Sequence, residues 1–160
     1  MSILALDPAT STGWAIARPT FPGSVEYRML ESGVQTFALS RGDSPGMRYL
    51  RFRRWLEDVT PGDCTLIVYE QNFRRGGAAT EVAANLAGRI QELCAIRAIE
   101  HTSVNVTTLK IWTCGSKKAA SKEAMKAAVC NRWKVVESDD EADAVALLHY
   151  AIAELVPSGR

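Results

Sequence analysis

The first residues of the chain place apolar runs on either side of a carboxylate and a short turn. Ile3–Leu6 is an unbroken apolar run, which is the pattern of a strand buried on both faces of a sheet. The run ends at Asp7 and Pro8, and a proline cannot donate a hydrogen bond to a sheet ladder. Thr10–Gly13 is typical of a turn, and Trp14–Ala17 resumes as a strand. The pattern predicts a hairpin with Asp7 at the end of its buried strand.

A second carboxylate stands in the same context. Thr65–Tyr69 is another apolar strand, and it ends at Glu70. An isolated Asp-Pro pair favours an acid that caps its own turn. Two buried strands that each end in an acid favour a shared site instead. If the two strands are neighbours in one sheet, Asp7 and Glu70 emerge side by side.

A late helix carries two further acids. Ser138 with Glu141 matches a capping box at its N-terminus. Asp143 lies one turn before Leu147, on the flank of the apolar stripe, where a carboxylate is costly unless something pairs with it. Asp140 lies three residues earlier on nearly the same side of the helix. Packed across the sheet, this helix would bring both acids to the strand ends.

Clustered carboxylates repel one another, and protonation or divalent cations must relieve that repulsion. Ligands that offer only oxygen favour Mg²⁺ or Mn²⁺ over Zn²⁺. Two such ions about 4 Å apart can clamp the attacking and leaving oxygens of a phosphodiester.

Composition indicates the size and general class of the protein. With 160 residues, of which 47% are hydrophobic, the chain is expected to form one globular domain over residues 1–160. A net charge of +1 points to no class of partner. The 4 cysteines lack metal-ligand spacing and are interpreted as reduced thiols of a cytoplasmic protein. No signal peptide or membrane-spanning run is expected.

The intervening segments predict alternating helices and strands. The expected elements are a third strand over Glu31–Leu39, a helix over Gly46–Val59, a long helix from Ala78 to Glu100, a short strand over Val104–Val106 and a helical turn over Leu109–Trp112. Four arginines of the first helix are weak evidence for DNA contact, because basic residues usually form a solvated face. The Lys-rich stretch Gly115–Lys126 leads into a further helix, with Ser116 or Ser121 as its N-cap.

Three motifs together resemble the RuvC family of Holliday junction resolvases, and more closely its phage-encoded members. They are LALDPATSTGW, IVYEQNF and DEADAVAL, in the family's order and over nearly the whole chain. Ala9 stands where the family usually has glycine. The resemblance implies an RNase H-like α/β fold, with a mixed five-stranded sheet whose first three strands are antiparallel, flanked by helices. It also implies an endonuclease that cleaves four-way junctions, forks and other branched DNA.

The resemblance assigns roles residue by residue. Asp7, Glu70, Asp140 and Asp143 match the acids that bind two Mg²⁺ or Mn²⁺ ions, and Asp139 is an alternative to Asp140. Lys110 and Lys122 match lysines near the scissile phosphate, and Lys122 is counted as catalytic. Phe73 matches an aromatic residue at the junction centre. The further expected DNA contacts are Arg74, Arg75, Lys117 and Lys118.

A homodimer is expected, because two-fold symmetric junctions need paired cuts. The small residues of the long helix are a candidate contact, with packing onto the chain's own sheet as the alternative: Ala83, Ala84, Ala87 and Gly88. Three other functions stay open: a nuclease for RNA or RNA–DNA hybrids, an actin-like ATP-binding protein, and a non-catalytic module that binds branched DNA. The actin-like architecture needs two such domains, for which 160 residues are too few.

Overall fold

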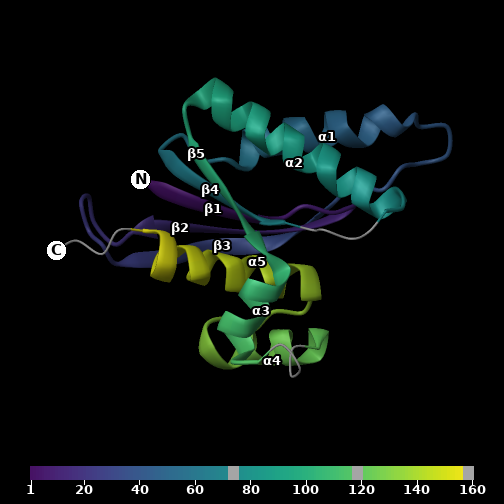
Figure 1. The fold of residues 1–160 in the computed structure, drawn as a ribbon. Coiled ribbons are helices and arrows are strands. Elements are labelled where there is room, and N and C mark those ends of the chain that lie inside the picture. The colour runs from purple at the N-terminus through teal and green to yellow at the C-terminus, as the bar shows by residue number, and fades with distance from the viewer. Residues whose placement is uncertain (72–75, 117–120, 157–160) are drawn as a thin grey trace.

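The computed structural model describes residues 1–71, 76–116 and 121–156, and it is built on one mixed sheet (Figure 1). The strand order is β3-β2-β1-β4-β5. Strands β3, β2 and β1 are antiparallel, and β4 and β5 run parallel to β1. The strands are β1 (Ser2–Asp7), β2 (Ser11–Pro19), β3 (Tyr27–Thr36), β4 (Cys64–Gln71) and β5 (Glu100–Asn105). The predicted α/β architecture is confirmed.

Helices cover both faces of this sheet. Figure 1 shows α1 and α2 on one side and α5, with α3 and α4 beyond it, on the other. Their bounds are α1 (Pro45–Val59), α2 (Ala78–Arg97), α3 (Val106–Cys114), α4 (Lys122–Arg132) and α5 (Asp139–Tyr150), which continues as the π-helical turn η1 (Ala151–Leu155). Within the described ranges, none of the helices has the length and apolar character needed to cross a membrane.

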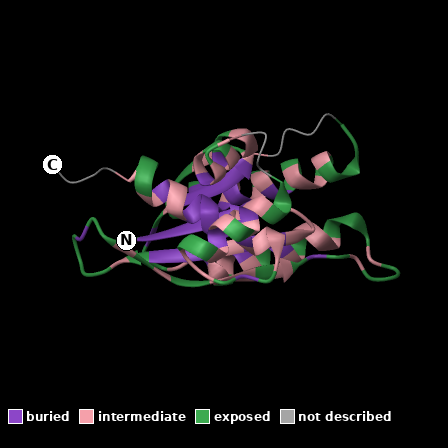
Figure 2. Cartoon of the chain, turned by 90° about the horizontal axis from the view of Figure 1, so that it is seen from below, coloured by how far each residue is buried: buried purple, intermediate pink, exposed green. Residues whose placement is uncertain are grey.

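Two apolar clusters hold these layers together, one on each face of the sheet. Leu4, Leu6 and Ile67 pack with α1 and α2, whereas Ile3 and Val68 pack with α5. The alternation follows from the two-residue period of a strand, which sends successive side chains to opposite faces. The central strands β1 and β4 are therefore buried on both sides, as their apolar runs predict. Figure 2 shows that the buried residues gather at the centre of the molecule, between exposed outer segments.

The edge strands differ from their predicted ranges. The third strand was expected over Glu31–Leu39 but spans Tyr27–Thr36, and the last strand spans Glu100–Asn105 instead of Val104–Val106. Both strands lie at sheet edges, where solvent-facing positions tolerate polar residues and blur the apolar pattern. The long helix stops at Arg97 because Ala98 adopts the left-handed conformation, with φ of 53°.

Candidate active site

Strand pairing brings the first two predicted acids together. Strands β1 and β4 are parallel neighbours, with Leu6 opposite Tyr69, so Asp7 and Glu70 follow at the same end of the sheet. Only 7% of Asp7 and 6% of Glu70 is exposed. The expectation that two buried strands would present their terminal carboxylates side by side is confirmed.

Helix α5 delivers the other two acids across strand β2. Ser138 caps the helix, its Oγ accepting a hydrogen bond from the Asp140 N–H at 3.2 Å. Gly13, opposite Asp7 in β2, lets the helix approach closely, because a Cβ built there would lie 1.8 Å from the Asp140 carbonyl oxygen. A glycine at this point of the sheet therefore allows the first turn of α5 to rest on the strand backbone.

The four predicted acids line one pocket of about 340 Å³. They come from β1, β4 and α5, and Lys110 of α3 and Lys122 of α4 line the same pocket. The remaining lining residues are Pro8, Ala9, Ala79, Thr80, Ala83, Val106 and Met125. Side chains up to about 136 positions apart in sequence, from Asp7 to Asp143, thus meet at one end of the sheet.

Two carboxyl groups of this pocket have pKa values raised above their ordinary range. Burial, opposed by the charge of Lys110 and assisted by the neighbouring Asp140, raises the pKa of Asp143 to about 6. Burial also raises the pKa of Asp140, against the influence of Lys122. A cation bound among these acids would stabilise each of them in its ionised form, because a positive charge favours the carboxylate.

The donor chemistry of the pocket fits Mg²⁺ or Mn²⁺, since its acidic side chains offer only carboxylate oxygens. In their present rotamers, no group of three or more His, Cys, Asp or Glu side chains among the described residues is arranged to hold an ion. Binding would therefore require the carboxylates to turn toward one another. The pocket supplies the right ligands in the right region without a preformed coordination sphere.

The structure separates Asp139 from Asp140. Asp140 lines the pocket, whereas Asp139 is not among the lining residues and faces Lys122 with 4.0 Å between Oδ2 and Nζ. The two neighbours point in different directions because successive helical positions differ by about 100°. The geometry favours Asp140 over Asp139 as the pocket acid.

Several predicted DNA contacts cannot be placed in this arrangement. Phe73, Arg74 and Arg75 lie outside the described residues, as do Lys117 and Lys118. Their predicted roles remain predictions from the sequence.

Two of the four arginines of α1 pair with acids of the same chain. Arg51 makes two hydrogen bonds to the Asp43 carboxylate, at 2.7 and 3.1 Å. Arg53 pairs with Glu57 at 3.2 Å and with Glu92 of α2 at 3.5 Å. The ion pairs of Arg51 and Arg53 weaken the sequence-based suggestion of DNA contact for these two residues.

The pocket walls include residues that the sequence analysis did not assign to the site. Thr80 and Ala83 come from the first turns of α2, which follow the glycine pair at 76–77. Ala83 was expected only as a dimer contact, and a helix start after a strand-end acid is the signal that could have placed both residues at the pocket. Val106 and Met125 form apolar wall, and no pattern distinguishes them from ordinary core residues.

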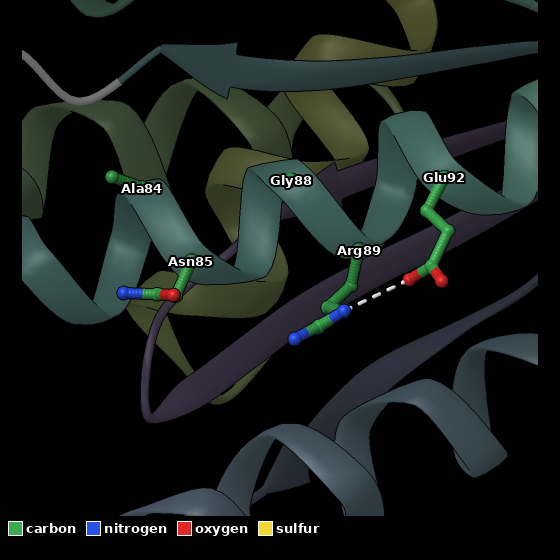
Figure 3. Close-up of a pocket in the computed structure, with 5 residues that line it drawn as sticks. All are labelled: Ala84, Asn85, Gly88, Arg89 and Glu92. Atoms are coloured by element: carbon green, nitrogen blue, oxygen red, sulfur yellow. Dashed lines mark hydrogen bonds and ion pairs between the residues drawn. The ribbon is translucent and has the colours of Figure 1, made fainter.

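A second, open hollow of about 410 Å³ lies on the outer surface of α2 (Figure 3). Its lining comes from this helix alone: Ala84, Asn85, Gly88, Arg89 and Glu92. Its one carboxylate, Glu92, already pairs with Arg89 at 3.0 Å and with Arg53. The larger hollow therefore lacks the acid cluster that distinguishes the pocket at the strand ends.

No protein-family model and no curated protein matches the chain. Solved structures do. The Thermus thermophilus RuvC structure is similar with a TM-score of 0.73 at 19% identity, covering 95% of this chain and 94% of that one. T. thermophilus RuvC in complex with a Holliday junction substrate is similar with a TM-score of 0.69 at 18% identity, covering 96% and 94%. Over almost its whole length, the chain has the RNase H-like fold of RuvC.

Proposed function

We propose that the protein is a divalent-metal-dependent endonuclease that cleaves Holliday junctions and other branched DNA. The observation that carries the proposal is the pocket in which four carboxylates and two lysines meet. It lies on a fold shared with a protein whose solved complex contains a Holliday junction. The three sequence motifs supply the acids of this pocket, so motif and geometry coincide.

The residues of the pocket would divide the work. Asp7, Glu70, Asp140 and Asp143 would hold Mg²⁺ or Mn²⁺. Two such ions, when bound, supply positive charge that stabilises the attacking and leaving oxygens of a phosphodiester. Lys110 and Lys122 extend into the same pocket and would offset the charge of the phosphate. No side chain has to form a covalent intermediate with the DNA.

Substitution of the strand-end acids tests the proposal. Asp7→Asn and Glu70→Gln should abolish Mg²⁺-dependent cleavage of a labelled four-way junction, because each removes a buried carboxylate while keeping its shape. Junction binding without metal should persist or improve, since negative charge facing phosphate is reduced. Asp58→Asn removes an exposed acid at the end of α1 and is the matched control, expected to cleave normally.

A substrate panel decides between the proposed and alternative functions. Four-way junction, fork, RNA–DNA hybrid and linear duplex should be compared at equal concentration with Mg²⁺. Preference for the junction supports the proposal, whereas preference for the hybrid would assign the pocket to an RNA-directed nuclease. Binding without any cleavage would indicate a non-catalytic module. Normal cleavage by Asp7→Asn would refute the assignment of the site.

We further propose that the protein acts as a homodimer, because two symmetric cuts need two sites. In the fold, the four small residues expected to form the dimer surface do not lie on one surface. Ala83 lines the acidic pocket and Ala87 packs against the core, so only Ala84 and Gly88 remain on the outer hollow of α2. Light scattering with and without junction tests the dimer, and a monomer under both conditions at micromolar concentration would contradict it.

A further inference from the structure

A hydrogen-bonded network lies beside the acidic pocket and shares none of its lining residues. Lys134 Nζ donates to Ser32 Oγ at 2.7 Å and to Glu141 Oε1 at 2.9 Å. Ser32 Oγ donates to the same Glu141 oxygen at 2.6 Å. The network joins strand β3, the segment after α4 and the first turn of α5. Only 15% of the Glu141 side chain is exposed, against 38% of the Lys134 side chain, so the carboxylate end of this ion pair is shielded from water.

Glu141 is the shared acceptor of this network, since Ser32 and Lys134 both donate to its Oε1. The local sequence would send Glu141 back toward Ser138 as part of a capping box. It turns to Ser32 and Lys134 instead, so a tertiary contact has replaced a local one.

An irregularity in the sheet aims Ser32 at this contact. The pairing of β2 with β3 shifts between Ile16 and Ala17, which face Glu31 and Met29 and leave Leu30 as an extra residue. Met29 packs against the cluster on the α5 side of the sheet. In a regular strand Ser32, three residues later, would face the opposite side. The bulge restores it to the α5 side, where it meets Glu141.

The network acts on the segment that carries two pocket acids. Glu141 directly follows Asp140 and precedes Asp143 by two residues. On the other side of the same turn, the Asp140 backbone rests on Gly13 of β2. Two contacts therefore hold the first turn of α5 in place: its backbone packs against β2, and its Glu141 side chain accepts a hydrogen bond from β3.

We propose that Ser32, Lys134 and Glu141 are positioning residues of the acidic pocket. They hold the first turn of α5 against the sheet and thereby set where Asp140 and Asp143 stand relative to Asp7 and Glu70. The inference rests on the proposed metal-dependent function. Residues that orient metal ligands without touching the ion commonly change metal affinity by about 10–100-fold.

Mn²⁺ binding, measured by electron paramagnetic resonance on the DNA-free protein, tests the network without relying on cleavage. Ser32→Ala and Lys134→Met should each weaken Mn²⁺ binding about tenfold. For Lys134→Met the direction of the change in Mn²⁺ affinity is diagnostic. Loss of a positive charge would by itself strengthen cation binding, so weaker binding points to lost positioning. The double variant should be little worse than either single variant, since both break one network.

Arg53→Met is the matched control. It removes the same charge and two ion pairs, more exposed than that of Lys134, on the opposite face of the sheet, so it should leave Mn²⁺ affinity unchanged. Lys134→Arg, which keeps the charge and donors, should retain most of the affinity. If Ser32→Ala and Lys134→Met lower the melting temperature while Mn²⁺ affinity stays within twofold of wild type, the network is merely structural and the proposal is overturned.

Failure of the proposed function gives a different result. Wild-type protein that binds no Mn²⁺ contradicts the metal site itself. In that case amide hydrogen exchange across α5 tests the network by itself. Faster exchange in the first turn of α5 for Ser32→Ala, and not for Arg53→Met, would support anchoring. Unchanged exchange there overturns it.

Discussion

Replacement of Gly13 by alanine should displace the first turn of α5. The new Cβ would lie 1.8 Å from the Asp140 carbonyl oxygen and 2.4 Å from its carbonyl carbon. Contacts below 3.0 Å essentially do not occur, so the helix or the strand must move by at least about 1.2 Å. Gly13 has no left-handed backbone conformation to preserve, and the effect is therefore one of contact alone.

The size of the effect follows from what must move. Overpacking typically costs about 1–3 kcal/mol, and the upper end applies here because both clashing partners are backbone. For a protein of this size each kcal/mol lowers the melting temperature by about 2–4 °C, so a fall of about 6–12 °C is expected. A misplacement of about 1 Å can cost about 10²-fold in rate, and Asp140 belongs to the displaced turn.

Thermal unfolding and single-turnover junction cleavage with Mg²⁺, run well below both melting temperatures, measure the two effects. Gly46→Ala is the control, because its nearest neighbour would be Ser44 Oγ at 3.8 Å. It lies in α1, where alanine stabilises by up to about 1 kcal/mol relative to glycine. Gly13→Ala protein that melts and cleaves like wild type would refute the close approach of α5 to β2.

Three further predictions concern individual residues. The pKa of Asp143, about 6, lies above its ordinary 3.8, so ionisation costs the folded state stability as pH rises through this range. The pKa of His149, lowered by burial to about 4 from 6.5, makes protonation costly as pH falls. The free energy of unfolding without metal should therefore change differently in the two variants as pH falls from 6.5 to 4.5. Relative to wild type, Asp143→Asn should become less stable and His149→Phe more stable. Denaturation experiments in which all three proteins show the same pH dependence would contradict both pKa shifts. Asp140→Asn should abolish Mg²⁺-dependent cleavage and Asp139→Asn should not, because only Asp140 lines the pocket; equal losses in a cleavage assay would leave the two acids equivalent. Phe73→Ala should slow junction cleavage by up to about 100-fold with little change in melting temperature, since a base–aromatic stack is worth about 1–3 kcal/mol; a large fall in melting temperature with normal cleavage would make Phe73 a core residue.

Much of the site could be predicted from short stretches of sequence. Apolar runs that end in Asp7 and Glu70 predict buried strands with terminal acids, because burial on both faces demands continuous apolar residues. Ser121 and Ser138 predict helix starts, and the structure confirms both caps, with Ser121 Oγ accepting from the Ala124 N–H. Such signals are local, so they survive without knowledge of the fold.

The tertiary structure decided the features that depend on distant partners. Glu141 leaves its local cap for Ser32, 109 positions away in sequence, because hydrogen bonds from both Ser32 and Lys134 are available there. Arg53 of α1 pairs with Glu92, 39 positions away in sequence, because α2 packs beside α1.

The edge strand and the small-residue helix show the same limit. Residue types indicate that a strand or helix forms, but the register of β3 comes from a bulge in its pairing with β2. The division of Ala83, Ala84 and Ala87 among pocket, surface and core comes from how α2 lies on the sheet. Sequence determines which segments become strands and helices and which acids end them, since those depend on neighbours along the chain. Only packing determines which faces meet, because that choice is made between segments far apart in sequence.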